Sequence, residues 1–253
     1  MKFIWTIVLF IFLTVLSASD MVMIISDSTA VDYRGKKNPY NKNKVGWEPM
    51  SGWGEFAAIA GVKDVKIINR SVGGYSSKTY WKNLHKRTSR DFRKGGWLLL
   101  SFGSNDARHH PKTAYRCTTA DGTFPEYMNK IASDAKAVGM NVVIISPPPF
   151  YSTENGKFFN SILKPYAEAS KKLAAENGYF FIDLFGAVNE YFANMSNQDI
   201  LSHYMFLKPG DSPNWPNGRK DPLHFTGKGS KMIWEIIRNA IKKDIPELSK
   251  LFN

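Results

Sequence analysis

Ser28 is the first candidate for a catalytic residue in this sequence. It follows a short apolar run, and a serine hydroxyl becomes a nucleophile when a neighbouring base takes its proton. Asp221 and His224 are separated by two residues, so the carboxylate can accept a hydrogen bond from one imidazole nitrogen while the other nitrogen faces Ser28. The same pair would also suit a cap on the final helix. We favour a serine nucleophile that attacks a carbonyl group, with Ser28, Asp221 and His224 as the catalytic residues.

Such an attack needs hydrogen-bond donors for the oxyanion that develops. Gly73 and Gly74 lack a Cβ, so the backbone there can approach a ligand and present N–H groups, although a plain tight turn has the same composition. Asn105 places a carboxamide after another apolar run. We expect the oxyanion hole to consist of Ser28, Gly74 and Asn105, and Asp106 to be a structural acceptor.

The elements that must position these residues alternate along the chain. Five short apolar runs, each too brief for a helix, have the β-branched and aromatic content of buried strands. The expected strands are Met21–Ile25, Val65–Ile68, Trp97–Phe102, Val142–Ile145 and Tyr179–Ile182. Helical spacing is found in Phe124–Val138, Phe159–Glu176 and Met232–Ile241.

This alternation predicts an α/β fold, a three-layer α/β/α sandwich with a central, mostly parallel five-stranded sheet of the flavodoxin-like kind. Ligands of such sheets bind at the carboxyl ends of the strands. The polar residues fit that rule, because Ser28, Asn69–Gly74 and Gly103–Asp106 each follow an expected strand.

The amino terminus differs from the rest of the chain. Lys2 is followed by an almost wholly apolar run to Leu16 and by small residues suited to cleavage, so residues 1–18 are expected to be a signal peptide. An uncleaved anchor is the alternative, but the run is shorter than the ~20 residues of a spanning helix. We therefore expect a secreted, extracellular protein in which residues 19–253 form a single domain.

Charge and cysteine content restrict the partners. The formal net charge is +12, and such a surface attracts anionic polymers or membranes. The basic residues are scattered and no nucleic-acid module accompanies them, so we expect no nucleic-acid partner. Cys117 is the only cysteine, which leaves no intrachain disulfide. His109 and His110 lack a third ligand at a recognisable spacing, so no metal and no cofactor is expected.

Two long stretches, Tyr33–Pro49 and Phe206–Pro222, are expected to be loops beside the site. Aromatic rings there can stack on sugar faces, although each ring could equally belong to the core. The candidate substrate-binding residues are Trp47, Trp53, Tyr75, His109 and Trp215.

These segments also carry a family resemblance. In order along the chain, the blocks Asp27–Thr29, Asn69–Gly74, Gly103–Asp106 and Asp221–His224 resemble those of the SGNH, or GDSL-type, hydrolases. The resemblance implies Ser28 as nucleophile, Gly74 and Asn105 as oxyanion residues, and Asp221 and His224 as the rest of a triad.

Within that superfamily, three segments are similar to the rhamnogalacturonan acetylesterase branch, carbohydrate esterase family twelve. They are Gly52–Phe56, Asn69–Ser76 and Asp221–Phe225. The resemblance implies removal of acetyl groups from pectin. Two departures stand against it: Ser26 replaces the usual glycine of the first block, and Pro147–Phe150 replaces an arginine pair that often follows the fourth strand.

The sequence thus predicts a monomeric secreted esterase that acts on an acetylated plant polysaccharide without stable membrane association. One alternative is a lipase-like or lysophospholipase-like esterase, for which the Lys, Asn and Gly content of Tyr33–Pro49 provides no apolar groove. A second alternative is an inactive carbohydrate-binding protein, which would have no use for the catalytic residues.

Overall fold

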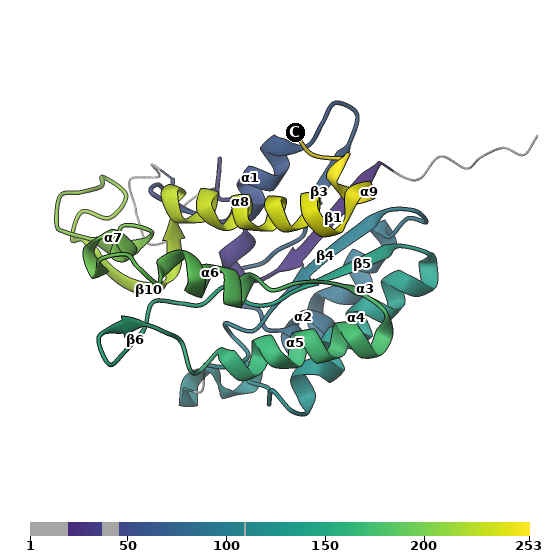
Figure 1. The fold of residues 1–253 in the computed structure, drawn as a ribbon, viewed down its shortest axis with the longest axis horizontal. Helices are drawn as coiled ribbons and strands as arrows, with labels where there is room; N and C mark the ends of the chain where they lie inside the picture. Colours follow the sequence, from purple (N-terminus) through teal and green to yellow (C-terminus); the bar gives the residue numbers. More distant parts are fainter. Residues whose placement is uncertain (1–19, 37–45, 109) are drawn as a thin grey trace, which may run out of the picture.

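A five-stranded parallel sheet forms the centre of the molecule (Figure 1). The structure is a computed structural model that describes residues 20–36, 46–108 and 110–253. The strand order is β3-β1-β4-β5-β8. The bounds are β1 Met21–Ser26, β3 Lys66–Asn69, β4 Trp97–Ser101, β5 Asn141–Ile145 and β8 Phe180–Ile182. All five expected strands are confirmed.

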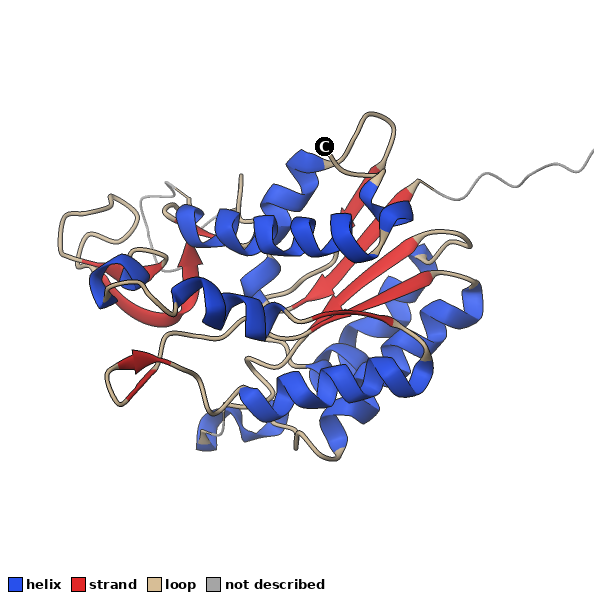
Figure 2. Cartoon of the chain, viewed as in Figure 1, coloured by secondary structure: helices blue, strands red, loops and turns tan. Residues whose placement is uncertain are grey.

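Helices cover both faces of this sheet, which confirms the three-layer α/β/α arrangement (Figures 1 and 2). On one face α1, α6 and α8 pack together, and on the other α2, α4 and α5 do. The helix bounds are α1 Trp53–Ala60, α2 Ser77–Tyr80, α3 Lys86–Thr88, α4 Thr123–Val138, α5 Lys164–Asn177, α6 Leu184–Phe192, α7 Asn197–Leu201, α8 Gly227–Asp244 and α9 Pro246–Ser249. Shorter segments are the 3₁₀ turns η1 Ser28–Ala30, η3 Ser89–Asp91 and η4 Pro111–Arg116, and the π-helical segment η2 Trp81–His85.

The alternation of side chains along β1 explains why the sheet has two cores. Val22 and Ile24 join the cluster under α1 and α8, whereas Met23 and Ile25 join the cluster under α4 and α5. Successive side chains of a strand point to opposite faces, so a strand buried on both faces is apolar throughout. The sheet therefore offers no polar group except at the ends of its strands.

The expected helix Phe159–Glu176 is wrong at its start, because α5 begins only at Lys164. The side chain of Asn160 accepts a hydrogen bond from the backbone N–H of Leu163 at 3.0 Å and holds a turn before the helix. Pro165 follows in the first helical turn, where its missing N–H costs nothing.

A second, three-stranded antiparallel sheet takes up the two ends of the loop expected over Phe206–Pro222, whose middle part, residues 208–218, is a loop as predicted. Its order is β2-β10-β9, with bounds β2 Met50–Ser51, β9 Tyr204–Leu207 and β10 Arg219–Thr226. The expectation was wrong at the end of the stretch because the start of β10 is charged, and its pairing with β9 outweighs its weak strand propensity. A two-stranded hairpin, β6 Thr153–Glu154 with β7 Lys157–Phe158, completes the strands of the described residues.

The expected signal peptide, residues 1–18, lies outside the described residues. In the part of the chain that the structure describes, no helix combines the length and apolarity needed to cross a membrane.

Candidate active site

Ser28 lies at the carboxyl end of β1, in the tight turn η1. The carboxylate of Asp27 caps this turn, because its Oδ1 accepts hydrogen bonds from the backbone N–H of Thr29 at 2.9 Å and from the Thr29 hydroxyl at 2.8 Å. Burial raises the pKa of Asp27 above its usual value. The cap fixes the backbone on both sides of Ser28, so its side chain leaves the strand end in a defined direction.

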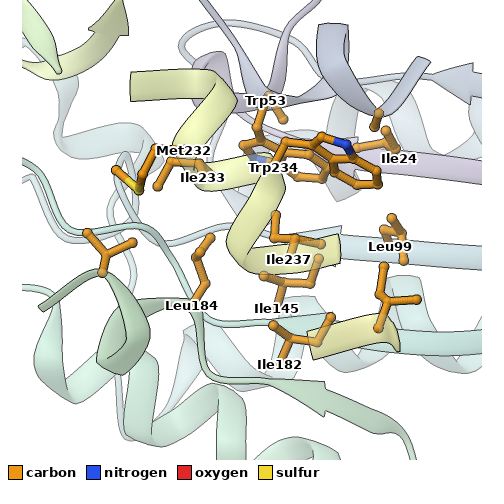
Figure 3. Close-up of a cluster of buried hydrophobic side chains, with 14 of the residues drawn as sticks. Ile24, Trp53, Leu99, Ile145, Ile182, Leu184, Met232, Ile233, Trp234 and Ile237 are labelled. Carbon is orange, nitrogen blue, oxygen red and sulfur yellow. The ribbon is translucent and has the colours of Figure 1, made fainter. Parts of the chain in front are cut away.

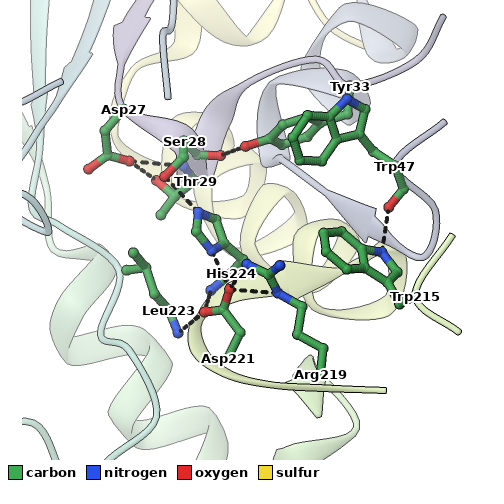
Figure 4. A network of polar contacts seen from close by, with 10 residues as sticks. All are labelled: Asp27, Ser28, Thr29, Tyr33, Trp47, Trp215, Arg219, Asp221, Leu223 and His224. Atoms are coloured by element: carbon green, nitrogen blue, oxygen red, sulfur yellow. Dashed lines mark hydrogen bonds and ion pairs between the residues drawn. The ribbon is translucent and has the colours of Figure 1, made fainter. Parts of the chain in front are cut away.

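Three side chains from opposite ends of the sequence form one hydrogen-bonded row (Figure 4). The Ser28 Oγ lies 3.0 Å from His224 Nε2, and His224 Nδ1 lies 2.7 Å from Asp221 Oδ2. With a neutral imidazole, Nδ1–H donates to the carboxylate and Nε2 accepts the hydroxyl proton. This is the arrangement that activates a serine.

A local irregularity of β10 creates the second half of that row. The pairing of β10 with β9 shifts register between Asp221 and Phe225. Asp221 Oδ1 accepts from the backbone N–H groups of Leu223 at 2.9 Å and His224 at 3.1 Å. Asp221 and His224 therefore share one turn, as the sequence predicted, and that turn is a bulge within β10.

Arg219 provides a further partner for this carboxylate. Its Nε donates to Asp221 Oδ2 at 2.9 Å, and its Nη2 makes a second contact with the same oxygen. Burial raises the pKa of Asp221, but the hydrogen bonds and charges of His224 and Arg219 outweigh burial and hold that pKa well below its usual value. Asp221 is therefore ionised at neutral pH.

The expected oxyanion residues Gly74 and Asn105 come from two segments that contact each other, and the segment with Gly73 and Gly74 passes Ser28. A Cβ on Gly73 would be 3.6 Å from the Ser28 Cβ, so this backbone passes the nucleophile in van der Waals contact. Gly74 has a φ of +81°, which favours glycine. Asn105 is buried, and its Nδ2 donates to the carbonyl of Tyr75 at 2.9 Å, which orients the amide and leaves its second N–H for another acceptor.

Asp106 has the structural environment that the sequence predicted. It is buried, and its carboxylate accepts from the backbone N–H of Ser77 and from the hydroxyls of Ser77 at 2.5 Å and Thr118 at 2.9 Å. Burial nevertheless raises the pKa of Asp106 to about 6. Its contacts tie the third block to α2 and to the segment after η4.

An aromatic cluster flanks the row (Figure 4). The Tyr33 hydroxyl donates to the carbonyl oxygen of Ser28 at 3.0 Å, and its ring lies 5.0 Å from that of Trp47. The Trp215 Nε1 donates to the backbone carbonyl of Trp47 at 3.3 Å, and the guanidinium of Arg219 lies 4.2 Å from the centre of the Trp215 ring. Burial also raises the pKa of Tyr33, so its phenol stays protonated.

The expected substrate contacts are corrected in two places. Trp53 has no exposed surface and belongs to the core cluster that contains Ile24 and Trp234, because it begins α1 with its ring toward the sheet (Figure 3). The prediction that it binds substrate is wrong. Trp215 is 7% exposed and the Arg219 guanidinium covers its ring, so it packs against Arg219 and leaves little surface for a sugar.

The other candidates are placed differently. Trp47 and Tyr75 are partly exposed, and Tyr75 adjoins Gly74 in the oxyanion segment. His109 lies outside the described residues. Among the described residues, no group of three or more His, Cys, Asp or Glu side chains is placed to hold a metal ion.

Sequence reasoning missed Arg219 and Tyr33. Side chains two residues apart in a strand share a face, so Arg219 would have been found next to Asp221 if β10 had been recognised. The hydrogen bond from Tyr33 to Ser28 joins a loop residue to a backbone carbonyl, and no sequence pattern signals such a contact.

A family model and two named proteins match this chain. The model of the GDSL-like lipase/acylhydrolase family matches residues 27–232. The probable rhamnogalacturonan acetylesterase YesY of Bacillus subtilis is 26% identical over 223 residues, which is 88% of this chain and 92% of that protein. The rhamnogalacturonan acetylesterase RhgT of the same organism is 25% identical over 197 residues, 77% of this chain and 82% of that one.

Solved structures share the fold. The acetylxylan esterase of Geobacillus stearothermophilus superposes with a TM-score of 0.61 at 14% identity, covering 88% of this chain and 94% of that one. Protein YxiM of Bacillus subtilis gives a TM-score of 0.68 at 21% identity over 88% of this chain, which spans only 56% of the length of YxiM. The chain belongs to the GDSL-like lipase/acylhydrolase family and is a carboxylic ester hydrolase.

Proposed function

We propose that this protein is a secreted esterase that removes O-acetyl groups from a plant cell-wall polysaccharide, with rhamnogalacturonan or a related pectin as its substrate. The observation that carries the proposal is the row from Ser28 Oγ through His224 to Asp221, with distances of 3.0 Å and 2.7 Å. The two Bacillus subtilis relatives named as rhamnogalacturonan acetylesterases support the substrate class.

The first half of the reaction forms an acyl-enzyme. His224 Nε2 takes the proton of Ser28 as Oγ attacks the acetyl carbonyl, and Asp221 stabilises the imidazolium that results. The N–H groups of Ser28 and Gly74 and the free N–H of Asn105 hold the oxyanion. The imidazolium then gives its proton to the sugar oxygen as its bond to the acetyl carbon breaks, and the acetyl group stays bound to Ser28 Oγ as an ester.

The second half releases acetate. Water replaces the sugar, His224 takes a proton from it, and the hydroxide attacks the acyl carbonyl at the same oxyanion site. Collapse of the tetrahedral intermediate returns the proton to Ser28 Oγ. Every proton transfer in both halves passes between His224 and Ser28, the sugar oxygen or water.

Charge and aromatic residues support a polysaccharide substrate. The net charge of +12 attracts an anionic chain such as a polymer of uronic acids. Trp47 is partly exposed beside Tyr33 on the side of the site that carries the aromatic cluster, where a sugar face can stack.

The proposal includes secretion of the protein. The basic start, apolar run and small residues within residues 1–18 support a cleaved signal peptide, with residues 19–253 as a single domain. Amino-terminal sequencing of the protein from the culture medium checks this part separately.

Acetate release from a panel of esters tests the substrate. Acetylated rhamnogalacturonan, acetylxylan and a lysophospholipid are incubated with the wild type and with Ser28→Ala at equal concentration. We expect the highest kcat/KM on the acetylated pectin and none with Ser28→Ala. Preference for acetylxylan or for the lipid would overturn the pectin assignment, and undiminished release by folded Ser28→Ala would overturn the mechanism.

A further inference from the structure

Arg219 and His224 donate to the same oxygen of Asp221. His224 Nδ1 lies 2.7 Å from Oδ2, and Arg219 Nε lies 2.9 Å from it. The other carboxylate oxygen, Oδ1, accepts the two backbone N–H groups of the turn. With both oxygens engaged, the carboxylate cannot rotate without losing charge-assisted hydrogen bonds.

Arg219 is itself held in place. Its guanidinium stacks on the Trp215 ring at 4.2 Å, and the Trp215 indole N–H is anchored on the backbone of Trp47. Only 26% of the Arg219 side chain is exposed. A stacked and doubly bonded guanidinium is ordered before substrate arrives, which distinguishes Arg219 from an arginine in a surface ion pair.

The positive charge of Arg219 lies close enough to His224, the proposed base, to affect it. Asp221 stabilises the imidazolium form of His224, and a guanidinium on the same carboxylate oxygen opposes that stabilisation. The charge of buried Asp27 also favours the imidazolium form of His224. Tyr33 interacts electrostatically with Asp221, Arg219 and Glu55. Arg219 contributes the positive charge bonded directly to Asp221.

We propose that Arg219 is a positioning residue of the ester hydrolysis, which fixes Asp221 and keeps His224 neutral, and so available as a base, at more acidic pH. This inference rests on the roles proposed above for Ser28, His224 and Asp221. It assigns to Arg219 an effect on the pH dependence of the rate that a residue serving only to hold β10 would not have.

Two substitutions separate charge from shape. Arg219→Gln keeps hydrogen-bond donors near Asp221 but removes the charge, whereas Arg219→Lys keeps the charge and loses the planar fork. Arg238→Gln is the matched control, because it removes the same charge from an exposed pair with Glu235 on α8. For each variant, kcat/KM on a soluble acetate ester and the rate of inactivation by a fluorophosphonate are measured against pH.

In Arg219→Gln, we expect the rise of both rates on the acidic side of the pH profile to move to higher pH by about one unit. The reason is that a base binds its proton more tightly when a nearby cation is removed. Arg219→Lys is expected to keep the wild-type position of this rise while its plateau falls, and Arg238→Gln to match the wild type. A lower plateau in Arg219→Gln without a shift, or equal shifts in both Arg219 variants, would overturn the inference.

Folding is checked by thermal unfolding at neutral pH. If neither Arg219→Gln nor Arg219→Lys folds, Arg219 is required for the structure and the inference is overturned. A Ser28→Ala sample measured in parallel separates the two proposals, because its inactivity together with an unshifted Arg219→Gln profile would refute only the role of Arg219.

Discussion

The Tyr33 hydroxyl donates a hydrogen bond to the backbone carbonyl of Ser28, with 3.0 Å between the two oxygen atoms. This contact joins the backbone of the proposed nucleophile to the aromatic cluster. Further contacts connect the cluster to the other end of the catalytic row, so that the residues form a closed ring of contacts (Figure 4). The ring passes through Ser28, Tyr33, Trp47, Trp215, Arg219, Asp221 and His224.

Replacement of Tyr33 by phenylalanine tests this ring. The Ser28 carbonyl loses a buried donor, so we expect the free energy of unfolding to fall by about 1 kcal/mol and kcat/KM to fall by up to about tenfold. Chemical denaturation and kinetics on an acetate ester measure the two effects. Tyr191→Phe, at an exposed position on α6, is the control. Wild-type stability and rate in Tyr33→Phe would refute a supporting role.

Asn105→Ala tests the oxyanion hole. Loss of a donor aimed at the developing charge lowers kcat by about 10²- to 10³-fold with little change in KM. Because Asn105 also holds the Tyr75 carbonyl, thermal unfolding is recorded beside the kinetics. Asn239→Ala, at an exposed position, provides a control for the loss of a carboxamide. An increase in KM with kcat unchanged would place Asn105 in substrate binding instead.

Trp47 and Trp53 are expected to respond in opposite ways. Trp53 is fully buried, so Trp53→Phe lowers stability by roughly 1 to 3 kcal/mol and leaves KM for the polysaccharide unchanged. Trp47 is partly exposed beside Tyr33, so Trp47→Ala raises KM for the polysaccharide more than KM for a small acetate ester. Both parameters are measured for both variants. A KM effect confined to Trp53→Phe would reverse the assignment.

Asp106 gives a prediction about stability and pH. Its folded pKa of about 6 lies above the unfolded value of 3.8, so the folded state binds more protons between these two pH values. Stability from this group is therefore present below about pH 4 and is lost as the pH rises through about 6. The free energy of unfolding of the wild type relative to Asp106→Asn should fall by roughly 2 to 3 kcal/mol across that window. A difference independent of pH would show that Asp106 does not titrate there.

The sequence was sufficient to predict the central sheet, because strands buried on both faces need apolar residues throughout. Ser28 could also be located, since it follows one of those strands at the edge of the sheet where ligands bind. The Asp221–His224 contact is local, and a spacing of three residues restricts its geometry enough to predict the hydrogen bond.

Features that depend on tertiary contacts were not predictable in this way. The charged start of β10 becomes a strand only by pairing with β9, and Arg219 was missed with it. Trp53 lies in the Gly52–Phe56 motif near the expected site, but the helix that it begins turns its ring into the core. A sequence shows which aromatic residues are near a site but does not show on which side of the backbone each ring lies.

The central claim is that Ser28 carries the acyl group, and trapping the intermediate tests it most directly. The enzyme is mixed with an activated acetate ester, quenched in acid within the first turnovers and digested, and its peptides are weighed by mass spectrometry. We predict one acetyl group on the peptide that contains Ser28, and none in His224→Ala. Acetylation of a different residue, or steady acetate release with no acetyl group on Ser28 at any time, would contradict the account.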